Sequence, residues 1–149
     1  PVHRGASLEV TFWDTSGSED YDRLRPLAYP QTDVFIVAFA INSRASFDNV
    51  LSKWVPEVLH HTPNARMVLA GLKSDLRQAA TSELVATRVG EDVAASLHIP
   101  AYRECSAITQ QGLGELMSAA FDVATGSAPT PPRRLQRVPI GRPLRPLGN

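Results

Sequence analysis

Two short motifs of this chain carry residue types suited to phosphate and purine chemistry. Asp14 and Gly17 form an Asp-x-x-Gly segment directly after an alternating run of residues. A carboxylate can order a metal-bound water, and a glycine amide can approach a phosphate oxygen closely. Further along, Lys73 has an aliphatic stem that can lie over a flat ring, and Asp75 follows two residues later. Outside a wider context, the first motif is a common turn and the second a surface charge pair.

The Asp75 carboxylate has a chemistry that would select one purine over another. A carboxylate can accept two parallel hydrogen bonds from the ring N–H and the exocyclic amine of guanine. Adenine presents no such pair of donors. A carboxylate at the end of a strand is therefore a candidate base-recognition residue.

Strand and helix patterns alternate along the chain and would position these motifs. Residues 8–13 alternate as in an edge strand, whereas 34–41 is a continuous apolar run typical of a central strand. Two further strands are predicted at 67–71 and about 101–105. Helices are predicted over 47–59, about 91–97 and 113–124, with Ser43 or Ser46 as an N-cap, a kink at Pro56 and Gly126 as a C-terminal cap. This order predicts an α/β fold with a doubly wound, mostly parallel sheet, whose ligands bind at the carboxyl ends of the strands.

Composition fits one domain followed by a tail. The chain has 149 residues and is 43% hydrophobic, which is enough for one core over residues 1–126. Its 15 lysines and arginines balance 15 aspartates and glutamates, so we expect no nucleic-acid binding. The single cysteine, Cys105, cannot form an internal disulfide and is assigned no chemistry. No apolar stretch or leader suggests a membrane span or secretion, which predicts a cytoplasmic protein.

The block from Asp14 to Pro30 resembles the switch II segment of Rho-family small GTPases. The resemblance continues in the family's order with Leu72–Arg77 and Glu104–Ala107, and covers roughly residues 8–125. It implies a Ras-like P-loop NTPase fold and a GTP/GDP switch that uses Mg²⁺ and hydrolyses GTP. By resemblance, Asp14 orders the magnesium shell, Gly17 senses the γ-phosphate and Ser18 takes the hydrolytic position. The base pocket would be formed by Lys73, Asp75, Ser106 and Ala107.

The chain also departs from this family's pattern. Ser18 stands where a water-orienting Gln is usual, so hydrolysis is predicted to be slow. Leu72 replaces a Thr or Asn, and the stretch 78–90 looks too short for the whole Rho insert helix. The phosphate-binding motif G-x-x-x-x-G-K-[ST] does not occur, and switch I and a central first strand are also not found. Two interpretations remain: an N-terminally incomplete Rho-like GTPase, or a nucleotide-independent interaction protein.

Two segments are candidate partner surfaces. Within switch II, aromatic, arginine and apolar side chains would contact effectors, exchange factors and GTPase-activating proteins, unless some of them pack on the core: Tyr21, Arg23, Leu24, Arg25 and Leu27. The tail, residues 127–149, is rich in Pro and Arg and is predicted to be disordered. It would be a plain solvated tail, bind an anionic membrane surface peripherally, or present Pro129-x-x-Pro132-x-Arg134 to an SH3 domain. No C-a-a-X box follows, so no prenyl anchor is predicted.

Overall fold

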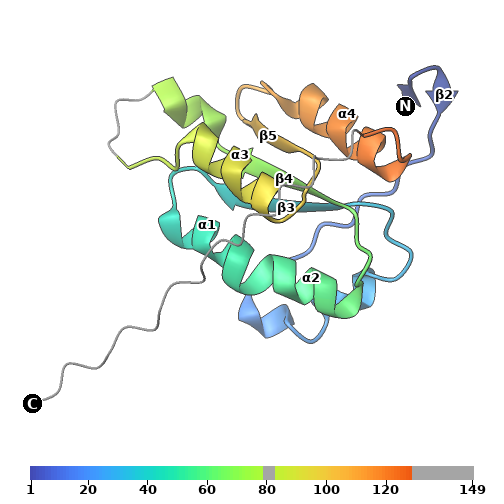
Figure 1. Cartoon of the computed structure of the whole chain (residues 1–149), viewed down its shortest axis with the longest axis horizontal. Helices are drawn as coiled ribbons and strands as arrows, with labels where there is room; N and C mark the ends of the chain where they lie inside the picture. The colour runs from blue at the N-terminus through green and yellow to red at the C-terminus, as the bar shows by residue number, and fades with distance from the viewer. Residues whose placement is uncertain (79–82, 129–149) are drawn as a thin grey trace, which may run out of the picture.

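A three-stranded parallel sheet with helices on both faces forms the centre of the molecule (Figure 1). This computed structural model describes residues 1–78 and 83–128. The strands are β3 (Phe35–Ala40), β4 (Met67–Leu72) and β5 (Tyr102–Cys105), in the order β3-β4-β5. Both neighbouring pairs are parallel, which confirms the predicted α/β class.

Strand β4 lies in the middle of this sheet. It pairs with β3 on one side and β5 on the other, and its first five residues are all buried. Such two-sided burial explains why the sequence of β4 is a continuous apolar run. At the carboxyl end, Leu72 lies opposite both Ala40 and Cys105, so the three strands end at one edge.

One face of the sheet is covered by a long, interrupted helix and by α3. The helix consists of α1 (Arg44–Asn49), the wide π-helical turn η3 (Val50–Trp54) and α2 (Val55–His61). Its buried residues are Phe47, Val50, Val55 and Val58, whereas Leu51 and Leu59, predicted on the same buried face, are exposed. Helix α3 (Thr87–Ser96) adds Ala94 to the same cluster.

The predicted N-cap of this helix is observed, and a π-helical turn stands beside Pro56, where a kink was predicted. Ser43 is the N-cap, and its hydroxyl accepts a hydrogen bond from the Ser46 amide at 3.2 Å. Near Pro56, the Val55 amide donates to the Val50 carbonyl, five residues back. Because Pro56 has no N–H and its ring crowds the preceding turn, a wider turn accommodates the proline without ending the helix.

The opposite face of the sheet is covered by α4 (Leu113–Ala124). Its buried residues Leu116, Ala120 and Val123 pack with Val68 and Ala70 of β4. The helix ends as predicted, because Gly126 adopts a left-handed conformation with φ of 73°. No helix in the described ranges is both long and apolar enough to cross a membrane.

The strand predicted over residues 8–13 is wrong. These residues form no strand, and Phe12 and Trp13 are 68% and 73% exposed. The prediction of β3 as a central strand is also wrong, since no described strand pairs with its outer edge and Ile36 is 37% exposed. Both differences have one physical reason, because the backbone groups of a strand need a neighbouring strand as partner. No described strand pairs with residues 8–13 or with the outer edge of β3.

The first residues form a small hairpin instead. Strands β1 (Val2–His3) and β2 (Ala6–Ser7) pair antiparallel around Arg4 and Gly5. Both turn residues have positive φ, as the tight turn requires. His3 and Arg4 each contact the Asp122 carboxylate of α4, at 2.8 and 2.7 Å. These hydrogen bonds, from His3 first and then Arg4, hold the pKa of Asp122 below its usual value.

The connections include three short 3₁₀ turns: η1 (Glu19–Tyr21), η2 (Arg25–Ala28) and η4 (Ser74–Gln78). Residues 79–82, within the stretch judged too short for an insert helix, lie outside the described residues. The predicted tail lies there as well from residue 129 onwards.

Gly112, which precedes α4, provides a test of this arrangement. Its φ is 76°, and a Cβ placed there would overlap the backbone oxygen of Glu104. We expect Gly112→Ala to lower the free energy of unfolding by more than about 1–2 kcal/mol, the cost of the left-handed conformation alone. The matched control is Gly114→Ala, where a Cβ meets open space and about 0.5–1 kcal/mol should be gained. Urea unfolding measures the free energy of unfolding of both variants. Equal effects would contradict the left-handed conformation of Gly112 and its close approach to Glu104.

Candidate functional site

Asp75 and Ser106 meet where β4 and β5 end. Asp75 lies in η4, three residues beyond β4, and Ser106 directly follows β5. The fully buried Ser106 hydroxyl donates a hydrogen bond to Asp75 Oδ1 at 2.5 Å. The same hydroxyl accepts from the Thr109 amide at 3.2 Å. Two residues that are 31 positions apart in the chain are thereby fixed against each other, with the Asp75 carboxylate held in place.

An ion pair beside this contact fastens the same two elements together. Arg77 of η4 binds Glu104 of β5 through two hydrogen bonds, Nε to Oε2 at 2.9 Å and Nη2 to Oε1 at 2.7 Å. Tyr102 also donates to Glu104 Oε1, at 2.7 Å. Burial raises the pKa of Glu104, but the hydrogen bonds from Arg77 and Tyr102 outweigh it, and the pKa lies below its usual value. Such two-point pairs are geometrically specific and hold planar groups in register.

Sequence reasoning gave Arg77 and Glu104 no role, although both lie within the quoted motifs. Their opposite charges were visible, but their proximity depends on the pairing of β4 with β5. A pocket of about 410 Å³ adjoins the pair and includes Ser74 and Gly112 in its lining. The segments that follow β4 and β5 are therefore joined both by the ion pair of Arg77 with Glu104 and by the hydrogen bond of Ser106 with Asp75.

Lys73 and Ala107, the other two predicted base-pocket residues, are both exposed. Lys73 adopts a left-handed conformation with φ of 64°, which turns the chain out of β4. The Ala107 carbonyl accepts a hydrogen bond from Gln110 Nε2 at 2.6 Å. The structure therefore brings all four residues to one edge of the sheet, with Asp75 and Ser106 in direct contact.

The predicted phosphate-side residues lie on a separate loop. Asp14, Gly17 and Ser18 are exposed. A Cβ at Gly17 would lie 3.5 Å from the Trp54 ring of η3. Arg25 donates hydrogen bonds to the main chain of this loop, and none of the hydrogen bonds found among the described residues joins the loop to Asp75 or Ser106.

Ser18 uses its hydroxyl locally. Its Oγ donates to Asp20 Oδ2 at 3.2 Å and accepts from the Asp20 amide at 3.4 Å, as the N-cap of η1. A hydroxyl on one carbon that is engaged in capping is poorly suited to orient a water. Slow hydrolysis stays a prediction.

Arg25 positions the loop, and its predicted role as a partner contact is wrong. The residue is only 6% exposed. Its Nε donates to the Ser16 carbonyl at 2.7 Å, and its Nη2 donates to the Ser18 carbonyl at 2.8 Å. On the other side, Nη1 binds Glu57 Oε2 of α2 at 2.9 Å. Arg25 therefore links the main chain of the loop to helix α2.

Further contacts surround Arg25 and Glu57. The Arg25 guanidinium lies 4.9 Å from the Trp54 ring centroid, and Asp22 pairs with it at 2.9 Å. Tyr29 donates to Glu57 Oε1 at 2.5 Å. Burial first, and then the Glu57 hydrogen bond, raise the pKa of Tyr29 well above its usual value. Sequence reasoning missed Glu57, because no local pattern places it near Arg25.

The residues present fit a guanine base better than they fit phosphates. A buried hydroxyl orients the Asp75 carboxylate, which is an acceptor of the type a guanine edge requires. On the phosphate side, Asp14 is a single carboxylate, and magnesium commonly binds proteins through only one or two. Within the described residues, no group of three or more His, Cys, Asp or Glu side chains is placed to hold a metal.

This sheet, with its helices on both faces and polar motifs after β4 and β5, defines a Ras-like α/β fold of the P-loop NTPase class. A sequence model of the Ras family matches residues 2–125. The chain is also 43% identical over 129 residues to the Ras-like GTP-binding protein RHO1 of Entamoeba histolytica. The chain belongs to the Ras family of small GTPases, and its similarity to RHO1 supports the Rho branch.

The alignment with RHO1 covers 87% of this chain but 60% of that protein. The chain thus spans less than two thirds of the relative's length. Ras-family proteins bind GTP or GDP with Mg²⁺, hydrolyse GTP, and interact with effectors, exchange factors and GTPase-activating proteins.

The role of Arg25 can be tested by its removal. Arg25→Met leaves the Glu57 carboxylate and two loop carbonyls without their cation, so we expect the free energy of unfolding to fall by about 3 kcal/mol or more. Arg23→Met is the matched control, because Arg23 is exposed in the same segment. Denaturant unfolding of both variants measures the difference. Equal losses would mean that Arg25 does not hold this loop.

Proposed function

We propose that this chain is the base-recognition and switch II portion of a Rho-like GTP/GDP switch. The observation that carries the proposal is the hydrogen bond from the buried Ser106 hydroxyl to Asp75 Oδ1. It orients a carboxylate at the carboxyl edge of a parallel sheet, where ligands of this fold class bind. Membership of the Ras family supports the same assignment.

At the base, Asp75 would accept the guanine ring N–H and exocyclic amine. The Lys73 stem would cover the purine face, and the backbone of Ser106 and Ala107 would contact the rim of the base. The ion pair between Arg77 and Glu104 lies outside this set and would keep η4 aligned with β5. Preorganisation of this kind lowers the entropy cost of binding.

At the phosphates, Asp14 would orient a water of the magnesium shell, and the Gly17 amide would respond to the γ-phosphate. Mg²⁺ supplies charge neutralisation at the phosphates when bound. Ser18 would hold the hydrolytic position, with its hydroxyl directed to Asp20 rather than to a water. Arg25 would keep the main chain of residues 16–18 in place during the exchange of nucleotide.

The identity of the base provides the sharpest test. Asp75→Asn loses one acceptor for guanine, and we expect the affinity for a fluorescent guanine nucleotide to fall by about 10- to 100-fold, equivalent to about 1.5–3 kcal/mol. The same variant should gain affinity for a xanthine nucleotide, because an amide N–H can pair with the carbonyl that replaces the amine.

The titration would use this chain and a longer chain that carries the motif G-x-x-x-x-G-K-[ST] ahead of Pro1. Asp92→Asn, on the exposed side of α3, is the control and should change neither affinity. If the longer chain bound guanine and adenine nucleotides equally, or if Asp75→Asn left the preference intact, base recognition by Asp75 would be excluded.

Hydrolysis gives a second test on the longer chain. Ser18→Gln should accelerate single-turnover GTP hydrolysis by about tenfold or more, since a carboxamide can position the attacking water. Ser18→Ala serves as the control and should hydrolyse GTP at the native rate, because the native hydroxyl is engaged with Asp20. Equal rates for the Ser18→Gln variant and the native chain would refute the assignment of Ser18 to the hydrolytic position.

A second candidate function is nucleotide-independent binding of partner proteins. The observation that favours it is the exposure of large side chains in the switch II segment: Leu24 is 57% exposed, Leu27 73% and Tyr21 48%. Together with Arg23, these residues would form the surface for effectors or regulators, and Arg25 no longer belongs to it. Saturable, magnesium-dependent binding of guanine nucleotide supports the switch, and partner binding without it supports this second function.

The remaining expectations concern the tail and the location of the protein. Binding of an SH3 domain or of an anionic membrane surface would use residues 129–149, which lie outside the described part of the chain. A cytoplasmic protein with peripheral membrane contact through the tail arginines stays a prediction.

A further inference from the structure

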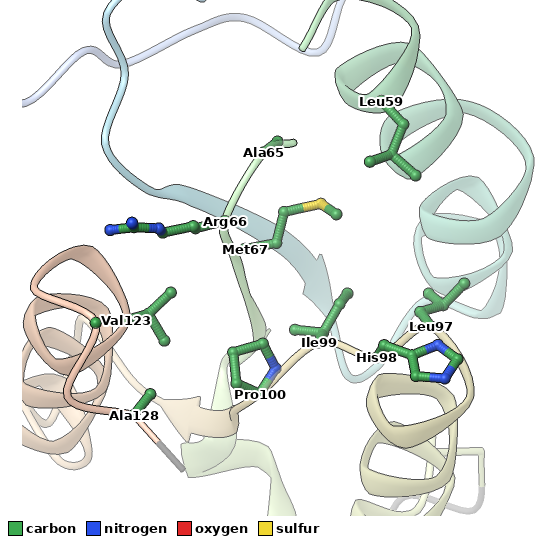
Figure 2. Close-up of a pocket in the computed structure, with 11 residues that line it drawn as sticks. Leu59, Ala65, Arg66, Met67, Leu97, His98, Ile99, Pro100, Val123 and Ala128 are labelled. Atoms are coloured by element: carbon green, nitrogen blue, oxygen red, sulfur yellow. The ribbon is translucent and has the colours of Figure 1, made fainter. Parts of the chain in front are cut away.

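An apolar pocket lies at the end of the sheet opposite to Asp75. Its volume is about 450 Å³, and Figure 2 shows its lining. Met67 is the first residue of β4, and Pro100 precedes β5, so the pocket opens at the amino ends of these strands. Leu59 of α2, Ile99 and Val123 of α4 contribute further apolar surface. No residue of the proposed nucleotide site lines it.

The described chain ends at the wall of this pocket. Ala128 is itself a lining residue and packs with the cluster of β4 and α4 side chains. Its amide and that of Ser127 both donate to the Asp122 carbonyl, at 3.0 and 2.8 Å. Ala128, the last described residue, thus lies at the rim of the pocket.

The charges of the pocket lining indicate which part of the chain after Ala128 could occupy it. Arg66 and His98 are the titratable side chains of its lining, and no acidic residue takes part. Arg66 donates to the Ala124 carbonyl at 2.5 Å, which keeps its guanidinium beside α4. Arginine side chains would therefore find no carboxylate here. Burial of an unpaired charge is costly, so a neutral segment fits better.

Residues 129–132, Pro-Thr-Pro-Pro, are such a segment. They carry no charge, follow Ala128 directly and precede Arg133, the first arginine of the tail. Prolines lose little conformational entropy on docking, because their backbone is already restricted. Attachment to the rim also gives the segment a high effective concentration.

We propose that the segment Pro129–Pro132 of this same chain occupies the apolar pocket between α2, α4 and the amino ends of β4 and β5. When they are docked there, the prolines are inaccessible to any proline-binding domain that would recognise Pro129-x-x-Pro132-x-Arg134. The tail arginines then begin at the rim, outside the apolar surface. The proposal does not depend on nucleotide binding.

Methyl NMR on the full-length chain tests this contact. Replacement of Pro129, Pro131 and Pro132 by Ser should shift the methyl signals of Leu59, Leu97, Ile99 and Val123. The matched control replaces Pro139, Pro143 and Pro146 by Ser and should leave those signals unchanged. Ile41 and Val50, which are buried elsewhere, report any general change of fold.

A soluble paramagnetic chelate gives an independent reading on the same samples. The pocket methyls should be protected from it in the native chain and in the control, and broadened in the Pro129/Pro131/Pro132 variant. Unchanged shifts and broadening in that variant would overturn the proposal. Equal effects of the two triple variants would assign the pocket to another part of the tail, and shifts that depend on protein concentration would assign it to a second copy.

Discussion

The pairing of β4 with a parallel neighbour on each side is the constraint on which the rest of the structure depends. It buries the first five residues of β4 and aligns Leu72 with Ala40 and Cys105. Because parallel strands end at one edge, the residues that follow β4 and β5 must meet there. A shift of β5 by one residue would turn Cys105 outward and remove the Ser106 hydroxyl from Asp75. The base recognition proposed for Asp75 therefore depends on strand register as much as on residue identity.

The two loops of the proposed site are held by different kinds of contact. Asp75 is held by a side-chain hydroxyl, and the element that carries it is fixed by the pair between Arg77 and Glu104. Residues 16–18 are held through their carbonyl oxygens by a single buried arginine. A contact to a main-chain oxygen is indifferent to the side chain at that position. The side chain at position 18 can therefore vary without loss of the loop geometry, which is how Ser18 is accommodated.

Local sequence signals predicted most of the elements but not their neighbours. Helical periodicity located α1 to α4, Ser43 identified a cap, and the apolar run at Met67 identified β4. Alternation at residues 8–13 predicted a strand that does not form, because alternation reports the burial of one face and says nothing of a pairing partner. For the same reason, the run that forms β3 predicted a central strand and not the edge that is observed.

The candidate site shows the same limit at the level of side chains. Asp75 and Ser106 were placed in one pocket by resemblance, whereas the hydrogen bond between them required the fold. Arg25 was assigned to a partner surface because arginine is enriched at protein interfaces. Its burial depends on Glu57, which is 32 residues away and carries no local signal. Burial of a charge is a property of the pair, so it cannot be read from either residue alone.

Helix α4 runs from the loop that carries Ser106 to the apolar pocket at the other end of the sheet. The helix starts beside Gly112, near the Ser106 loop, and ends beside the apolar pocket; its 12 residues correspond to about 18 Å. Leu116, Ala120 and Val123 pack on β4 along this whole length. Coupling between distant sites requires an element with two discrete arrangements. A helix that is packed along its length has a single arrangement and does not meet this requirement. The apolar pocket and the proposed base site therefore lie at opposite ends of one rigid support.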